Sequence, residues 1–256
     1  MNERMNIRRM QAPERKTDPA FDAKRDISER DWERIFQRIT FDFDKITPPT
    51  DMVAAVKLLN PKYPYELDDL KRDKLREHVS NDRVGSYQHK ALMKCIDSKL
   101  AEKPSAALFK EMEDRMASEA SSGSYVGLFS TVLESYLILH NTHQFALSNE
   151  VKQGIEAELA KHRAMKRWTL FLRLAAVYRL ACGEPVITEE DWVALRADLA
   201  EERRKNNSHD FTMLARDQQI LAADKVSVTD SGIEIRPHVA KKATDQHPPQ
   251  PESLTL

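Results

Sequence analysis

The chain has 256 residues and a formal net charge of −1; 41% of its residues are hydrophobic, 32% are charged and six are glycine. This length can bury a sizeable core, whereas so few glycines disfavour sandwiches and barrels that depend on tight turns. A nearly neutral chain has no global field to hold DNA or an anionic membrane, so such a partner would need a local basic patch. We therefore expect an all-α fold.

Residues 1–26 mix both charges with two prolines and have no sustained apolar face, which predicts a flexible N-terminal arm. They contain no apolar stretch like that of a secretory signal, and no run of about 18 apolar residues follows. We expect a cytoplasmic protein without a membrane partner. Cys95 and Cys182 stand among apolar helical neighbours without metal-ligand spacing, so we interpret them as core residues in a reducing compartment.

The segment ISERDWERIFQRI at residues 27–39 recurs as ITEEDWVALRADL at residues 187–199. The two copies are 160 residues apart (187 minus 27), and 160 is four times 40, so a 40-residue repeat predicts further copies near residues 67, 107 and 147. LDDLKRDKLREHV and LSNEVKQGIEAEL fit at residues 67 and 147, whereas the copy near residue 107 is displaced by about one residue.

Both quoted copies begin with the signals of a capped helix. The matched pairs are Ile27 with Ile187, Ser28 with Thr188, Asp31 with Asp191, and Trp32 with Trp192. We expect the Ser or Thr to be the N-cap and the acid three residues later to complete a capping box. Each Trp then packs on the Ile that precedes the cap, as in a hydrophobic staple, so we expect both tryptophans to be structural.

A second helix is predicted after the first helix of each unit. The five apolar runs end at Leu59, Leu100, Leu139, Leu180 and Leu221, in steps of 41, 39, 41 and 41 residues. Their apolar residues follow helical spacing, and turn formers or charges separate them from the first helices. Residues 27–226 are therefore predicted to form five helical hairpins.

This pattern resembles the broad class of α-helical hairpin solenoids, with a HEAT-like unit length. The resemblance implies an α-solenoid in which stacked hairpins share one core and the second helices line a surface that binds another macromolecule. The alternative is a chance alignment of amphipathic helices of similar length.

The fourth unit contains the strongest local charge. Residues 147–186 hold seven Lys or Arg and four Glu, a net charge of +3, whereas residues 105–146 and 187–226 each have a net charge of −3. The candidate macromolecule-binding residues are Lys161, Arg163, Lys166, Arg167, Trp168 and Arg173. The cations could hold an acidic peptide or nucleic-acid phosphates, with the indole stacking on a base. Alternatively this is a solvated turn whose Trp folds onto the core and whose charges pair with neighbouring units.

The C-terminal part predicts a short β-hairpin at residues 227–236, because VSV and IEI alternate apolar and polar residues around TDSG. A lone hairpin is marginally stable, so we expect it to pack on the last helices. Residues 237–256 are polar and rich in Pro, which predicts a disordered tail.

No motif indicates an enzyme. HExxH, ExxH, GxxxxGK[ST], GxGxxG and GxSxG are all missing from the sequence, so we assign no catalytic, cofactor-binding or metal-binding residues and expect no small-molecule substrate. Glu134, His140 and His143 could hold a metal loosely, but a surface loop explains the histidines equally well. His209-Asp210 is similar to the dipeptide of helical metal-dependent phosphohydrolases, and we prefer Asp210 as the cap of a helix that begins at Phe211.

These observations favour a non-enzymatic scaffold or adaptor that binds a protein partner along a helical-repeat surface. A second hypothesis is a nucleic-acid-binding helical-repeat protein, similar to a DNA-repair glycosylase, that holds phosphates with the basic residues of the fourth unit. A third is a compact helical phage, viral or effector structural protein in which the repeat is incidental.

Overall fold

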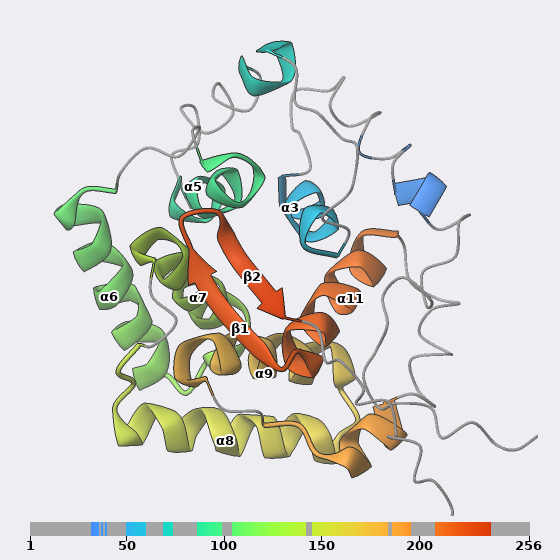
Figure 1. Ribbon diagram of the computed structural model, residues 1–256. Helices are drawn as coiled ribbons and strands as arrows, with labels where there is room; N and C mark the ends of the chain where they lie inside the picture. Colours follow the sequence, from blue (N-terminus) through green and yellow to red (C-terminus); the bar gives the residue numbers. More distant parts are fainter. Residues whose placement is uncertain are drawn as a thin grey trace, which may run out of the picture.

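The computed structural model describes residues 32–35, 37, 39, 50–59, 69–73, 86–98, 104–141, 145–183, 186–195 and 208–236. Most of these residues are helical, and they include one two-stranded antiparallel sheet (Figure 1). The all-α character and the predicted hairpin are confirmed. The predicted arm at residues 1–26 and the predicted tail at residues 237–256 lie outside the described part of the chain.

The principal elements follow the order of the predicted hairpins. They are α3 (Thr50–Leu59), α5 (Ser86–Ile96), α6 (Ala106–Ser121), η2 (Tyr125–Phe129), α7 (Ser130–His140), α8 (Asn149–Ala164), α9 (Trp168–Cys182), α11 (Ser208–Ala222), β1 (Lys225–Thr229) and β2 (Gly232–Arg236). The five predicted second helices correspond to α3, α5, α7, α9 and α11, and two of the predicted first helices correspond to α6 and α8.

The second helices pack in a closed order rather than in an open row. Helix α3 contacts α5, α5 contacts α7, α7 contacts α9, α9 contacts α11, and α11 returns to contact α3. In an open solenoid the first and fifth units would not touch, because each unit contacts only its neighbours. A solenoid is therefore not confirmed. Figure 1 shows these five helices around the hairpin, with α6 and α8 on the outside.

Helices α7 and α9 form the centre of the molecule. Every residue from Val132 to Leu139 of α7 is buried, and so is every residue from Leu174 to Ala181 of α9. A helix that is apolar on all sides is stable only when other elements surround it. These two helices consequently offer little surface to a partner, unlike the second helices of the predicted solenoid.

The predicted N-cap at Thr188 is confirmed. The Asp191 backbone N–H donates to Thr188 Oγ1 at 3.2 Å, and the Thr188 N–H donates to Asp191 Oδ2 at 3.0 Å, which is a reciprocal capping box. Ser148 caps α8 by accepting the Val151 N–H at 3.3 Å. The equivalent cap at Ser28 lies outside the described residues.

Trp192 is buried in the main core, and Ile187 is partly buried against the same core, as the predicted staple requires. Trp32 is half-buried, and Ile27 lies outside the described residues.

The structure differs from the sequence-based prediction at the start of α11 and at the start of α7. Helix α11 begins at Ser208, so Asp210 lies inside the helix and the predicted start at Phe211 is wrong by three residues. The turn before α7 also contains a break that the sequence did not predict: Gly127 has φ 86 and ψ −111, which a helix cannot contain.

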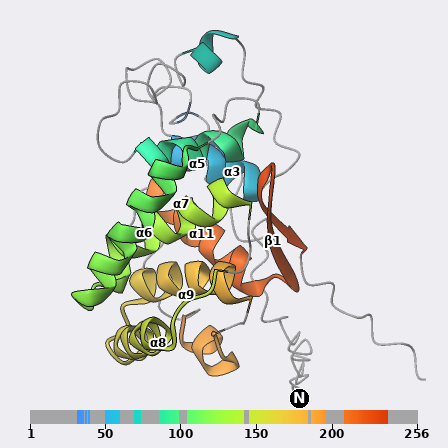
Figure 2. The same cartoon turned by 90° about the vertical axis from the view of Figure 1, so that its left-hand side faces the viewer.

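The β-hairpin covers one face of the helical ring. Strands β1 and β2 pair from Lys225 opposite Arg236 to Thr229 opposite Gly232. Strand β2 contacts α3 and α5, whereas β1 contacts α7 and α9, so the hairpin spans the ring rather than packing on the last helices alone. Figure 2 shows it from the side. Gly232 has φ 98, and a Cβ there would lie 2.6 Å from Cys95 Sγ, so glycine permits the close approach of β2 to α5.

No helix among the described residues is both long enough and apolar enough to cross a membrane.

Candidate functional site

The helical ring and the hairpin enclose a cavity of about 540 Å³, here called the chamber. All five second helices and strand β2 contribute described residues to it. The apolar part of its wall consists of Ala54, Leu58, Ala91, Leu92, Ile138, Met213, Ile233 and Ile235. Gln88, Ser231 and Glu234 also line the chamber and are exposed. The chamber is therefore a mainly apolar space between segments that are far apart in the sequence.

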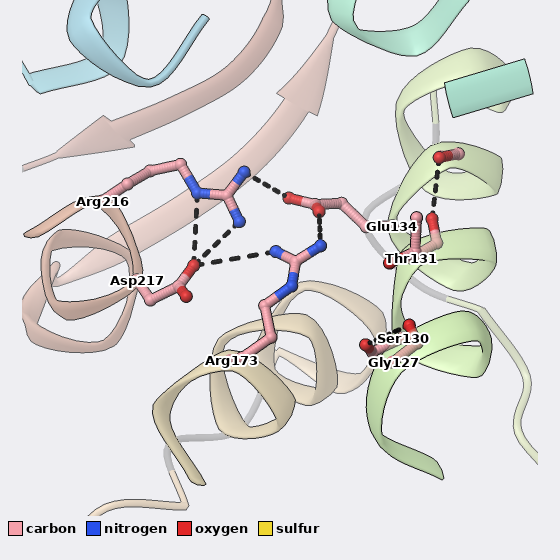
Figure 3. A network of polar contacts seen from close by, with 8 residues as sticks. Gly127, Ser130, Thr131, Glu134, Arg173, Arg216 and Asp217 are labelled. Carbon is pink, nitrogen blue, oxygen red and sulfur yellow. Dashed lines mark hydrogen bonds and ion pairs between the residues drawn. The ribbon is translucent and has the colours of Figure 1, made fainter. Parts of the chain in front are cut away.

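One side of the chamber carries a buried network of alternating charges (Figure 3). Glu134 comes from α7, Arg173 from α9, and Arg216 and Asp217 from α11. Glu134 Oε2 accepts a hydrogen bond from Arg173 Nη2, and Glu134 Oε1 lies 3.1 Å from Arg216 Nη1. Asp217 Oδ1 accepts from Arg216 Nη2 at 2.8 Å and from Arg216 Nε at 3.2 Å. The network therefore ties three helices together at the centre of the ring.

Glu134 and Arg216 are charged at neutral pH. Burial alone would raise the pKa of Glu134, but the Arg173 and Arg216 guanidinium groups outweigh burial and lower this pKa to about 2. Burial disfavours the charged form of Arg216, yet Glu134 and Asp217 raise its pKa above the ordinary value. A buried ion network of this kind is strongly destabilised when one partner is removed.

Two buried atoms of the network, Glu134 Oε1 and Arg173 Nη1, make no hydrogen bond to a described residue, and Arg173 Nη1 is the donor of the two. Arg173 Nη1 lies 3.8 Å from Asp217 Oδ1, which is an ion pair but too long for a hydrogen bond. The side chain of Arg173 is 21% exposed, against 4–8% for the other three members.

The chamber also contains a lysine and a thiol. Burial lowers the pKa of Lys57, partly offset by Asp97, and Lys57 Nζ donates a hydrogen bond to the Ile96 carbonyl. Burial raises the pKa of the Cys95 thiol to about 11, so Cys95 is protonated at neutral pH and is not an activated nucleophile. The described lining includes no histidine. These groups do not indicate acid–base or nucleophilic catalysis.

The structure separates the six basic-stretch residues predicted to bind a macromolecule. Lys161 is exposed and pairs with Glu158 at 3.0 Å. Arg163 Nε lies 2.7 Å from Asp191 Oδ1, and its guanidinium lies 5.2 Å from the centre of the Phe171 ring. Arg163 therefore links α8 to the helical turn that contains Asp191.

Trp168 is 5% exposed and packs edge-to-face on Phe171, with ring centroids 5.7 Å apart, so its indole is not available for stacking on a ligand. Arg173 lines the chamber. Lys166 and Arg167 remain exposed at the turn between α8 and α9.

Two apolar side chains flank these cations. Met165 is 50% exposed and Leu170 is 38% exposed. We call Met165, Lys166, Arg167 and Leu170 the α8–α9 corner. Neither Lys166 nor Arg167 forms an ion pair with a described residue.

Glu134 and His140, two residues of the loose metal set considered in the sequence, have different partners. His140 stacks on Tyr136, with ring centroids 5.4 Å apart, whereas Glu134 belongs to the buried network. His143 lies outside the described residues. The part of the chain that the structure describes contains no group of three His, Cys, Asp or Glu side chains placed to hold a metal ion.

Arg216 and Asp217 were not predicted from the sequence to be site residues. Both lie in the apolar run DFTMLARDQQIL, and Glu134 lies in the equally apolar run STVLESYLIL. Charged residues flanked on both sides by the apolar positions of a buried helix could have been recognised as partners, since buried charges are rarely left unpaired.

Comparisons with protein-family models, with curated proteins and with solved structures gave no match to this chain. The fold and its geometry therefore define the class: a helical protein whose second helices close into a ring, with a β-hairpin across one face.

Proposed function

We propose that this protein is a non-enzymatic scaffold or adaptor that binds an acidic, partly apolar segment of a protein partner at the α8–α9 corner. The observation that carries this proposal is the exposed pair Lys166 and Arg167 between the exposed side chains of Met165 and Leu170. Methionine and arginine are enriched in protein interfaces, and cations at an interface steer an acidic partner toward it.

The backbone at the corner supports the proposal. Lys166 has φ 53, in the left-handed region, where glycine or asparagine would fit with less strain. A lysine held in this conformation places a cation at the turn despite the cost, and such outliers occur more often at functional sites.

A protein partner explains the corner better than a nucleic acid does. The predicted nucleic-acid mode added stacking on the indole of Trp168 to the phosphate contacts, and that indole is buried. The two exposed neighbours of the cations are aliphatic, which suits a protein interface rather than a phosphate backbone. Nucleic-acid binding remains the alternative outcome of the experiment.

We interpret the helical ring that includes this corner as five hairpin repeats that curve until α11 contacts α3. We propose that the partner binds on the outside of the ring rather than along the second helices, because α7 and α9 are buried on nearly all sides. A rigid ring would then present the corner in a constant geometry.

The experiment compares the wild-type protein with Lys166→Glu/Arg167→Glu. A fluorescent peptide of alternating glutamate and leucine and a fluorescent DNA duplex are titrated with each protein, and binding is followed by anisotropy at low and at physiological salt. We expect peptide binding by the wild type and about tenfold weaker binding or worse by the variant, because two attractive contacts become repulsive.

The matched control is Lys110→Glu/Arg115→Glu, which reverses two exposed cations on α6. It should leave peptide binding unchanged. Equal losses in both variants would show a non-specific charge effect and overturn the proposal. Tighter binding of the duplex than of the peptide would support the nucleic-acid alternative instead.

A further inference from the structure

We infer that the chamber is a binding site for a small organic acid whose carboxylate binds Arg173 and whose apolar body lies against α3, α5 and α7. This inference is independent of the proposed role of the α8–α9 corner, because the chamber and the corner share no residue.

The size and lining of the chamber suit such a ligand. Its volume of about 540 Å³ lies within the range of small-molecule sites, roughly 300–1,000 Å³. These sites are mostly apolar and contain a few converging polar groups that orient the ligand. Here Leu58, Leu92 and Ile138 belong to the apolar wall, and the guanidinium groups of the network converge on one side.

Two buried side-chain atoms of the chamber wall make no hydrogen bond to a described residue, Glu134 Oε1 and Arg173 Nη1, and the donor of the two belongs to a cation. Arg173 Nη1 has no hydrogen-bond acceptor among the described residues, and Arg173 is the most exposed member of the network. Both oxygens of Glu134 already face a guanidinium group, one from Arg173 and one from Arg216. A ligand carboxylate would supply the missing acceptor, and arginine binds carboxylates with favourable geometry.

A second cation of the wall would also gain from an anion. Lys57 is partly desolvated, and its ammonium group donates to a backbone carbonyl, that of Ile96. An added negative charge in the chamber would favour its charged form. Asp51 and Glu234 line the chamber as well, so a second negative group on the ligand would be repelled. We therefore infer a ligand with a single negative charge and an apolar remainder.

The test uses two fluorescent probes with the same aromatic rings. Anilinonaphthalene sulfonate carries one negative charge, and N-phenylnaphthylamine carries none. Each is titrated with the full-length protein at neutral pH, and its fluorescence gives the affinity. We expect one site per chain that binds the anionic probe at least about tenfold more tightly, since a hydrogen bond to a charged group contributes at this level.

Four variants locate the probe. Arg173→Gln should weaken anionic-probe binding about tenfold and leave the neutral probe unchanged. Ala54→Trp, which fills the chamber, should abolish binding of both probes, whereas Ala107→Trp on the exposed side of α6 should change neither. Lys166→Glu/Arg167→Glu should also change neither. Circular dichroism and thermal melting of each variant show whether it is folded.

Octanoate should displace the anionic probe, and octanol, which has the same chain length without the carboxylate, should not. The inference is overturned if the wild type binds neither probe or binds both equally. It is also overturned if binding survives Ala54→Trp, or if the corner variant abolishes it, because the probe would then occupy another surface. These wild-type and Ala54→Trp results do not depend on whether Arg173→Gln folds.

Discussion

Glu134→Gln should destabilise the protein strongly, because it removes the carboxylate that lies between Arg173 and Arg216. The structure allows two estimates of the loss. The pKa of Glu134 falls from 4.5 to about 2, and a shift of this size corresponds to roughly 3 kcal/mol of stability at pH 7. Independently, breaking a buried ion pair costs about 3–5 kcal/mol. We expect a loss of about 3 kcal/mol in the free energy of unfolding at pH 7.

The effect of Glu134→Gln should depend on pH in a defined direction. The folded pKa of Glu134 lies below its unfolded value, so between about pH 2 and pH 4.5 the unfolded chain binds more protons than the folded chain. The stability that this carboxylate contributes is complete above the unfolded pKa and is lost as the pH falls toward 2. The difference between wild type and variant should therefore shrink on acidification.

Urea unfolding at pH 7 and at about pH 3, followed by circular dichroism, measures both effects. Asp114→Asn is the matched control, since Asp114 pairs with Lys110 at 3.4 Å and both side chains are largely exposed. It should cost less than about 1 kcal/mol. The reasoning fails if Glu134→Gln costs no more than this control at pH 7, or if its deficit grows as the pH falls.

Trp192→Ala should destabilise the protein by about 3 kcal/mol or more and lower the melting temperature, because it empties a buried position of the main core; an unchanged melting curve would count against the staple. Gly232→Ala should lower the free energy of unfolding in urea more than Gly123→Ala does. Both glycines have positive φ, but only a Cβ at position 232 would lie 2.6 Å from Cys95 Sγ. The Cys95 thiol, with its pKa raised to about 11, should react with iodoacetamide at pH 8 far more slowly in the native protein than in urea, as mass spectrometry of the alkylated peptide would show.

The sequence predicted the local architecture because local forces set it. Apolar spacing located the second helices, whose observed ends at Leu59, His140 and Cys182 lie within two residues of the predicted leucines. The capping box of Thr188 and Asp191 was predicted from residues three apart, which interact whatever the rest of the chain does. The hairpin followed from strict alternation around a turn.

The roles of the residues in the basic stretch could not be predicted from the sequence alone. Lys166, Arg167 and Arg173 are neighbours in the sequence, but α9 begins at Trp168 and carries Arg173 more than one turn into the helix. The start of the helix therefore divides one run of charges between an exposed corner and a buried network. The partners of Arg173 come from α7 and α11, so the sequence alone does not indicate that it pairs with Glu134.

The sequence by itself determined the helical class, the positions of the second helices, the cap at Thr188 and the terminal β-hairpin, since each depends on residues within a few positions of one another. Only the tertiary structure decided that α11 returns to α3, that a chamber lies inside the resulting ring, and that Glu134 meets two arginines there. The physical reason is that these contacts join residues far apart in the sequence and depend on the angles at which the helices pack, which no local pattern shows.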